Sequence, residues 1–209
     1  MNNIQYWYNS ATRQEIIFCH NSTISYPWHN HSSIFTIGLL LAGTLNLQIG
    51  KTNITCLPGY IFIIPPYLPH RLTANQPYTM LTICLPNTQT NIFNANTNKL
   101  WFELTEQIKN QPEQALNLDE MAQTVYLSKY HFLRCFKQTV GLTPHQFQLQ
   151  NRVRKAQRML NQNTGITEVA LATGFCDQSH FIRQFKKHLG LTPSAYQAAY
   201  HQISSSAPA

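Results

Sequence analysis

The chain has 209 residues, of which 43% are hydrophobic and 11% charged, and its formal net charge is +7. This length exceeds that of a usual single domain, so two domains are expected, and no run reaches the roughly 18 to 20 consecutive apolar residues of a membrane helix. The five cysteines are scattered and include no Cys-x-x-Cys pair. That pattern argues against a disulfide framework or a structural zinc site, and it predicts reduced thiols in the cytoplasm.

The sequence predicts an all-β domain over residues 1–86. The runs SIFTIGLLLAG, TLNLQIG, NITCLPG, YIFIIPP and YTMLTICLP are short and rich in Ile, Leu, Thr and aromatic residues, with Gly, Pro and Asn between them. This spacing is typical of a sandwich or barrel. In TLNLQIG, the alternation places Leu45, Leu47 and Ile49 on one face of a strand.

A linker with one short helix is predicted over residues 87–112. It contains the Asn/Thr-rich stretch NTQTNIFNANTN, followed by KLWFELTEQIKN, which has helical character and is a candidate dimerisation or docking helix. Residues 113–201 are predicted to be all-α, and residues 202–209 are predicted to be a disordered tail.

The helical half contains an internal repeat. HFLRCFKQTVGLTP (residues 131–144) and HFIRQFKKHLGLTP (residues 180–193) lie 49 residues apart and share nine residues in register. In each copy, the glycine can end a helix in the left-handed conformation. The threonine can then cap the next helix, with proline at its first position. A shorter helix precedes each copy, and the turn in the second copy is expected to be one residue longer. The sequence thus predicts two helix-turn-helix units.

The second helix of each predicted unit has a polar outer stripe. These stripes are Tyr130, Leu133, Arg134 and Lys137 in the first unit, and Ser179, Ile182, Arg183 and Lys186 in the second, with Gln178 and His180 beside them. Residues 111–209 carry ten Lys/Arg against five Asp/Glu, a basic balance that favours a polyanionic partner. Ordinary amphipathic helices with charged outer faces are the alternative.

A long helix is predicted between the two units, within TPHQFQLQNRVRKAQRMLNQ. About 18 helical residues span roughly 27 Å. With the width of the helices added, that length could hold two reading helices about one DNA turn apart, roughly 34 Å. Two successive major grooves of double-stranded DNA are therefore the expected target.

Residues 117–196 resemble the C-terminal domain of AraC/XylS-type transcriptional regulators. The resemblance rests on LDEMAQTVYLSKYHFLRCFKQTVGLTPHQF, RVRKAQRML and ITEVALATGFCDQSHFIRQFKKHLGLTPSAY. It implies a double helix-turn-helix that binds promoter DNA and commonly activates transcription through contact with RNA polymerase. Carried over by position, the base-reading candidates are Tyr130, Leu133, Arg134, Gln178, Ser179, His180, Ile182 and Arg183. The phosphate-contacting candidates are Lys129, Lys137 and Lys186.

The N-terminal domain resembles the cupin-like effector domain of the same family, through PWHNHSSIFTIGLLLAG and PGYIFIIPPYLPH. The metal ligands of such barrels would fall at His29, His31 and His70. The accompanying glutamate is replaced by Thr36 (or by Phe35, with shorter spacing), and the glycine of the second motif is replaced by Tyr67.

Three readings of these histidines remain open. They could bind a metal, hydrogen-bond within the barrel mouth, or line an effector pocket with Trp28 and with Trp7 or Tyr26. The third is preferred, so neither a metal nor another cofactor is expected.

The sequence as a whole predicts a non-enzymatic, cytoplasmic DNA-binding regulator, an activator whose cupin-like domain senses a small molecule. The alternatives are a regulator whose cupin is an effector-independent interaction module, and a cupin metalloprotein. The expected oligomeric state is a monomer or a homodimer, because the region between barrel and helices is shorter than is usual in the family.

Overall fold

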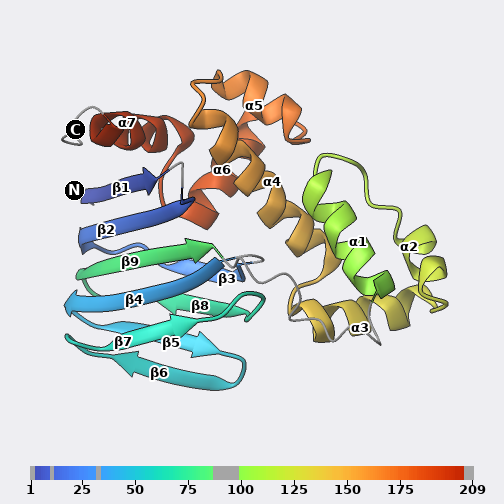
Figure 1. Cartoon of the computed structure of the whole chain (residues 1–209), viewed down its shortest axis with the longest axis horizontal. Helices are drawn as coiled ribbons and strands as arrows, with labels where there is room; N and C mark the ends of the chain where they lie inside the picture. The colour runs from blue at the N-terminus through green and yellow to red at the C-terminus, as the bar shows by residue number, and fades with distance from the viewer. Residues whose placement is uncertain (1–2, 10–11, 32–33, 87–98, 205–209) are drawn as a thin grey trace. The chain divides into compact units, whose positions relative to one another are not determined.

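The computed structural model describes residues 3–9, 12–31, 34–86 and 99–204 (Figure 1). Its contacts divide the chain into two units, residues 1–88 together with 185–209, and residues 89–184. Among the described residues, no helix is long and apolar enough to cross a membrane.

The first unit contains two antiparallel sheets, which confirms the predicted strand-rich, cupin-like fold. One sheet has the strand order β1-β2-β9-β4-β7 and the other β3-β8-β5-β6. The strands are β1 (Asn3–Asn9), β2 (Gln14–Ser22), β3 (Tyr26–His29), β4 (Ile34–Ala42), β5 (Leu45–Ile49), β6 (Thr52–Cys56), β7 (Ile61–Ile64), β8 (His70–Thr73) and β9 (Tyr78–Pro86).

The interior of this unit follows from strand alternation. Along β9 every second residue is buried as far as Cys84, and along β5 Leu45 and Leu47 are buried whereas Ile49 is half-buried. All five cysteines are free. Burial raises the pKa of the Cys19 thiol to about 11 although hydrogen bonds involving Tyr26 and Tyr78 act to lower it, so this thiol stays protonated and unreactive at neutral pH.

The last helix, α7 (Pro193–Ser204), belongs to the same unit and packs beside β1. The rings of Tyr6 and Tyr196, both buried, meet edge to face with centroids 5.4 Å apart. The helical domain predicted from the sequence over residues 113–201 includes most of α7. The helix also runs three residues into the predicted tail, of which residues 205–209 lie outside the described structure.

The second unit holds two helix-turn-helix motifs joined by a long helix. Its helices are α1 (Lys99–Asn110), α2 (Leu118–Thr124), α3 (Lys129–Val140), α4 (Pro144–Leu160) and α5 (Ile166–Ala172), followed by α6 (Gln178–Leu189), whose last five residues fall in the first unit. Four residues separate α2 from α3 and five separate α5 from α6. The predicted one-residue difference between the two turns is confirmed.

The repeated Gly-Leu-Thr-Pro signal stops and restarts a helix as expected. Gly141 ends α3 with φ of 81°, a left-handed conformation that glycine adopts without a steric penalty. Thr143 then caps α4 in a capping box with Gln146, and Pro144 occupies the first turn. In the second copy, the Thr192 hydroxyl accepts a hydrogen bond from the Ala195 amide at 3.3 Å.

Helix α1 is part of the core of the first motif. Its Leu104 and Ile108 are buried in one cluster with Phe132 and Phe136 of α3, and the Trp101 ring stacks on Phe132 with centroids 5.6 Å apart. This contact buries part of the apolar surface of α1, while Leu100 and Phe102 of the same helix are exposed. The dimerisation or docking role of this helix stays a prediction. Residues 87–98 of the predicted linker lie outside the described structure.

Gly174 is the glycine whose replacement should damage the helical unit most. Its φ is +77°, and an added Cβ would lie 2.8 Å from the Cα and carbonyl oxygen of Glu113. We expect Gly174→Ala to lower the free energy of unfolding by about 2–4 kcal/mol, from left-handed strain plus crowding against backbone. Urea titration followed by circular dichroism measures this change.

Gly50→Ala is the matched control. Gly50 also has a positive φ, of 58°, but an added Cβ would meet nothing within 4 Å. The expected cost is therefore only the conformational one, about 1 kcal/mol. Equal losses for the two variants would mean that the approach of Glu113 to Gly174 is not what requires the glycine.

Candidate nucleic-acid interface and effector site

The outer face of α3 presents the predicted polar residues. Tyr130 is 86% exposed, and Arg134 and Lys137 are exposed beside it. Leu133 differs, because it is half-buried and packs against the core of the first motif. That packing accounts for an apolar residue at this position without any DNA contact, so its base-reading role stays a prediction.

On α6, Ser179, Arg183 and Lys186 are exposed and Ile182 is half-buried. Gln178 is tied to the first helix of its own motif, since its Oε1 accepts a hydrogen bond from the Thr167 hydroxyl at 3.0 Å. The exposed arginines thus occupy equivalent positions in the two copies of the repeat, Arg134 on α3 and Arg183 on α6.

His180 is held at the start of α6 by local contacts. Its backbone amide donates to Asp177 Oδ1 at 2.6 Å, and its ring meets Phe175 edge to face with centroids 5.5 Å apart. The bond from this amide and one from the Cys176 thiol hold the pKa of the Asp177 carboxyl below its usual value. The cap of the second reading helix therefore stays ionised at neutral pH.

Lys129, predicted to contact phosphate, is engaged within the protein. Its Nζ lies 2.9 Å from Asp119 Oδ2, and both side chains are largely exposed. An exposed pair of this kind is weak, so a phosphate could compete with Asp119 for the lysine. The comparable candidates Lys137 and Lys186 are exposed.

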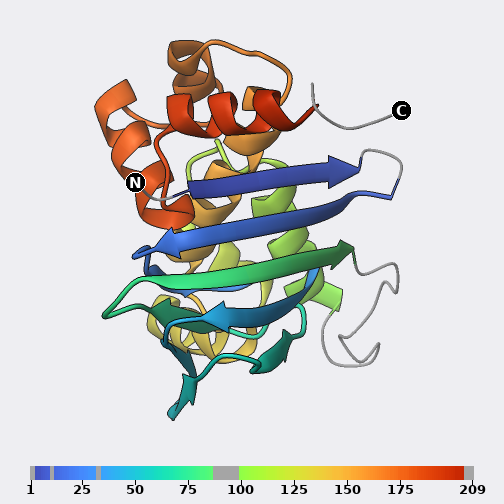
Figure 2. The ribbon, with the colours of Figure 1, turned by 90° about the vertical axis from the view of Figure 1, so that its left-hand side faces the viewer.

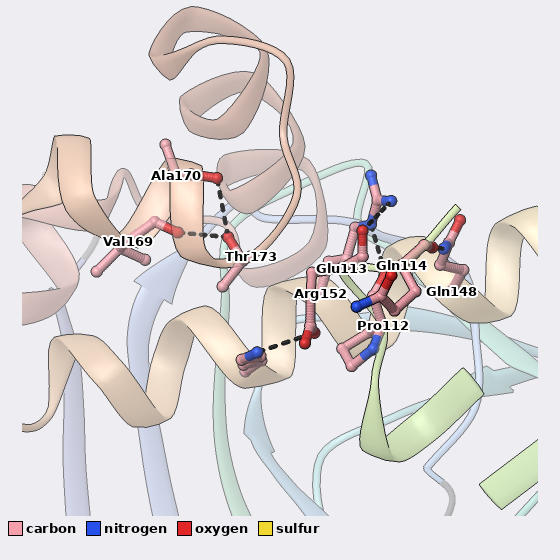
Figure 3. A network of polar contacts seen from close by, with 9 residues as sticks. Pro112, Glu113, Gln114, Gln148, Arg152, Val169, Ala170 and Thr173 are labelled. Carbon is pink, nitrogen blue, oxygen red and sulfur yellow. Dashed lines mark hydrogen bonds and ion pairs between the residues drawn. The ribbon is translucent and has the colours of Figure 1, made fainter. Parts of the chain in front are cut away.

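A polar network that the sequence did not reveal ties α4 to the segment before α2 and to the turn after α5 (Figure 3). The Arg152 guanidinium donates to the Pro112 carbonyl at 2.7 Å, to the Glu113 carbonyl at 3.4 Å and to the Gly174 carbonyl. Three backbone carbonyls from two segments therefore converge on one side chain.

Two more residues on the same stripe of α4 reinforce this junction. Gln148 is buried and donates from Nε2 to the Gln114 carbonyl, and Lys155 Nζ lies 2.8 Å from Glu113 Oε2. Burial acts to raise the pKa of the Glu113 carboxyl, but the bond from Lys155 and the charge of Arg152 outweigh it and the pKa is lowered.

These contacts change the role of α4 in the site. Phe147, Val153, Ala156 and Leu160 recur at roughly helical spacing and are buried. Arg152 and Lys155, however, bind protein groups. Arg152 and Lys155 lie four and seven residues after Gln148, a spacing that any solvated helix face can show, so periodicity alone could not have found the network.

Three histidines converge in the strand-rich unit. His29, at the end of β3, pairs in register with His70, at the start of β8. The ring centroids of His29 and His70 are 4.2 Å apart, and that of His31 lies 5.1 and 5.2 Å from them. One ring nitrogen from each histidine lies within 4.8 Å of the others, so the structure brings these predicted residues together.

The tautomers of two of these histidines follow from their backbone contacts. His29 Nδ1 lies 2.7 Å from the Pro27 carbonyl and His70 Nδ1 lies 2.9 Å from the Leu68 carbonyl. A carbonyl can only accept, so each Nδ1 must carry the proton. In the neutral ring, Nε2 is then left as an acceptor or a metal ligand.

Two replacements in the cupin-like motifs have structural consequences. Thr36, where a carboxylate would stand, is buried with an inward position on β4, and among the described residues its hydroxyl has no hydrogen-bond partner. Tyr67, where a glycine would stand, has φ of 64°, and its amide donates to the His31 carbonyl at 2.7 Å. A bulky residue in this left-handed region is strained, which is expected at ligand sites.

The three aromatic residues suggested for the pocket do not all lie near the histidines. Trp28 adjoins His29, and the Arg71 guanidinium lies 5.8 Å from its ring centroid. The Tyr26 ring lies 6.3 Å from that of His29. Trp7 alternates with the buried Tyr6 and pairs with Ile16, so it faces away from the interior. The suggestion that Trp7 lines the pocket is wrong.

Two family models match the chain, one over the strand-rich region and one over the helical region. Residues 13–91 match the AraC-like ligand binding domain, and residues 121–199 match a helix-turn-helix domain.

Two curated relatives match about a third of the chain each. The chain is 34% identical over 64 residues to the uncharacterised HTH-type transcriptional regulator YbfI of Bacillus subtilis (strain 168), covering 31% of this chain. It is 34% identical over 73 residues to the HTH-type transcriptional regulator MtrA of Neisseria gonorrhoeae, covering 34% of this chain. These matches span only 23% and 24% of the two relatives.

Among solved structures, ToxT from Vibrio cholerae O395 has a similar fold. Its TM-score is 0.62, and the superposition covers 90% of this chain and 97% of that chain at 10% identity. At this identity the likeness concerns the fold alone.

Removing the Arg152 side chain should loosen the junction in the helical unit. We expect Arg152→Ala to lower the free energy of unfolding by about 2–4 kcal/mol, because three carbonyls lose a charged donor. Chemical unfolding monitored by circular dichroism measures this free energy of unfolding. Arg158→Ala, on the exposed side of the same helix, should change stability by no more than about 0.5 kcal/mol. Indistinguishable values for the two variants would contradict the structural role of Arg152.

Proposed function

We propose that this chain, which belongs to the AraC-type family of transcriptional regulators, binds promoter DNA sequence-specifically through two helix-turn-helix motifs and responds to a small molecule held in its cupin-like domain. One observation carries the proposal. The second helix of each motif exposes an arginine at the equivalent position, Arg134 on α3 and Arg183 on α6. An arginine on such a helix suits bidentate pairing with guanine in the major groove.

On α3 and α6, the lysines and the arginines are suited to different contacts with DNA. Lys137 and Lys186 stand one turn after these arginines and are suited to phosphate contacts, which position the protein without reading sequence. The 17 residues of α4 span about 25 Å. With the helix widths added, this length fits two reading helices in successive major grooves, about one DNA turn apart.

The remaining base-reading candidates fall into two groups. Tyr130 and Ser179 are freely accessible from solvent, whereas Gln178 and His180 are oriented by Thr167 and Phe175. Orientation before binding lowers the entropic cost of a specific contact. Leu133 and Ile182 are half-buried, and their accessible carbons are suited to a thymine methyl group.

The effector site is the histidine cluster with Trp28. The Nε2 atoms of His29 and His70 can accept hydrogen bonds, and the buried Thr36 hydroxyl is a polar group that a ligand or water could satisfy. These features favour a small polar molecule as the effector. For the effector to act allosterically, it must bind the two DNA-binding states of the protein with different affinity.

The rest of the proposed function follows the family. The regulator acts in the cytoplasm as an activator, through contact with RNA polymerase, and has no enzymatic activity. A DNA-binding protein whose cupin senses no ligand is the alternative. A ligand that binds only the folded state raises the melting temperature, so a thermal-shift screen of small molecules distinguishes the two.

A metal-binding cupin is the second candidate. Three ring nitrogens converge within 4.8 Å, and backbone carbonyls fix the tautomers of His29 and His70. Metal-ligating histidines are oriented by hydrogen bonds of this kind. With Thr36 in place of a carboxylate, we still expect no resident metal. Titrating chelator-treated protein with Zn²⁺ should give no saturable rise in melting temperature. A saturable rise that His31→Asn abolishes would establish the metal candidate instead.

Two variants should distinguish a base-reading residue from a phosphate-contacting one. Arg183→Ala should weaken binding to the preferred duplex by about 1–3 kcal/mol and leave binding to random duplex nearly unchanged. Lys137→Ala should weaken binding to both duplexes alike and reduce the salt dependence of the affinity. Fluorescence anisotropy at several stated salt concentrations measures both effects, and equal losses on both duplexes for Arg183→Ala would overturn its base-reading role.

A further inference from the structure

Two tyrosines of the first helix-turn-helix motif are the most exposed large hydrophobic residues among those that the structure describes. Tyr126 is 90% exposed and Tyr130 is 86% exposed, whereas the next, Leu171, is 69% exposed. Tyr130 is the second residue of α3, and Tyr126 lies in the four-residue turn between α2 and α3. This turn therefore carries an aromatic side chain that is almost wholly in solvent.

The backbone at Tyr126 is strained. Its φ is 57°, in the left-handed region that glycine enters freely but that is unfavourable for a bulky residue. A residue held in this region costs stability, and such residues cluster at binding and catalytic sites. Because the Tyr126 side chain is not buried, packing within the protein does not offset this cost. A partner outside the chain would account for a tyrosine here.

The second motif has a glycine at the equivalent position, Gly174. The Tyr126 amide donates to the Gln123 carbonyl at 2.9 Å, and the Gly174 amide donates to the Leu171 carbonyl at 3.1 Å. The φ of Gly174 is also positive, at 77°. An added Cβ at Gly174 would lie 2.8 Å from the backbone of Glu113, whereas the Tyr126 side chain extends into solvent. Because glycine satisfies this turn, the fold of the motif does not require the tyrosine.

The turn adjoins the end of α3 that faces DNA in the proposed function. In a helix-turn-helix, the N-terminal residues of the second helix contact base edges in the major groove. The turn that precedes α3 then lies at the edge of that groove, beside the sugar-phosphate backbone. Lys129, three residues after Tyr126, is exposed and brings positive charge to this edge. These surroundings fit a polyanionic backbone better than they fit an apolar protein surface.

We propose that Tyr126 is a DNA-contact residue, which anchors the first motif to the backbone beside the groove that α3 enters. Its hydroxyl donates a hydrogen bond to a phosphate oxygen, and its ring packs on the adjoining deoxyribose. Tyrosine is among the residues that make such contacts, which position a protein without reading sequence. The inference rests on the proposed DNA binding and extends it, because the second motif, with Gly174, lacks this contact.

Tyr126→Gly should weaken DNA binding without destabilising the protein. Glycine removes the left-handed strain, so the melting temperature should not fall. Fluorescence anisotropy should show an affinity lowered about five- to twentyfold, the loss expected for one hydrogen bond and one aromatic contact. The loss should be the same on a random duplex and on the duplex that the full chain selects from a random pool. Tyr126→Phe, which keeps the ring, should lose only about two- to fivefold.

Asn21→Gly is the matched control. Asn21 also has a positive φ, of 50°, and is exposed. It lies on β2, which Figure 2 shows between β1 and β9 in the five-stranded sheet. The substitution places glycine in the same kind of backbone conformation and leaves the net charge unchanged, so the affinity for both duplexes should not change.

Neutral methylphosphonates, substituted one at a time along the selected duplex, locate the contact. One substitution should weaken binding of the unchanged chain but cost Tyr126→Phe nothing further, because that variant already lacks the hydrogen bond. This position should flank the box whose sequence preference Arg134→Ala relaxes, since Arg134 and Tyr126 belong to the same motif.

Several results would overturn the contact. If Tyr126→Gly binds both duplexes as tightly as the unchanged chain, the contact is wrong and the proposed function stands. A melting temperature that falls would show that Tyr126 stabilises the motif itself, and a loss confined to the selected duplex would make it a base-reading residue. An unchanged chain that binds no duplex would overturn the proposed function and this contact together.

Discussion

The guanidinium of Arg152 is the contact on which the geometry of the helical unit depends. Pro112 and Glu113 precede the first motif, and Gly174 lies in the turn of the second, so one side chain on α4 fixes both motifs to the helix between them. Because α4 contributes buried residues along its whole length, its length sets how far apart the two motifs are held. A spacing set this way can match the repeat of a DNA duplex only if the junction stays rigid.

The sequence predicted the helical unit closely because its signals are local. Gly141, Thr143 and Pro144 stop one helix and start the next through their own backbone preferences, and the stripe of Phe132 and Phe136 follows from helical period alone. Arg152 could not be predicted, because its partners are backbone carbonyls roughly 20 to 40 positions away in sequence, and carbonyls carry no residue signature. The packing of α7 against β1 could not be predicted either, because the contact of Tyr6 with Tyr196 joins residues at opposite ends of the sequence.

In the strand-rich unit, the motifs predicted which histidines meet, and the structure adds how they are held. His29 and His70 meet because β3 and β8 are paired, and each ring is fixed by a carbonyl two residues before it in the chain. Trp7 does not line the pocket, because successive side chains along a strand point to opposite faces of the sheet. Alternation from the buried Tyr6 turns Trp7 to the opposite side of the sheet, where it pairs with Ile16 of β2.

The central claim is that two linked motifs read two sites on one duplex. The most direct measurement is selection of preferred duplexes from a random pool by the full chain, at a stated salt concentration. The account predicts enrichment of two short boxes centred about 10–10.5 base pairs apart, and insertion of half a turn between the boxes should abolish the preference. Failure to enrich any sequence, or enrichment of boxes whose spacing is immaterial, would contradict the account.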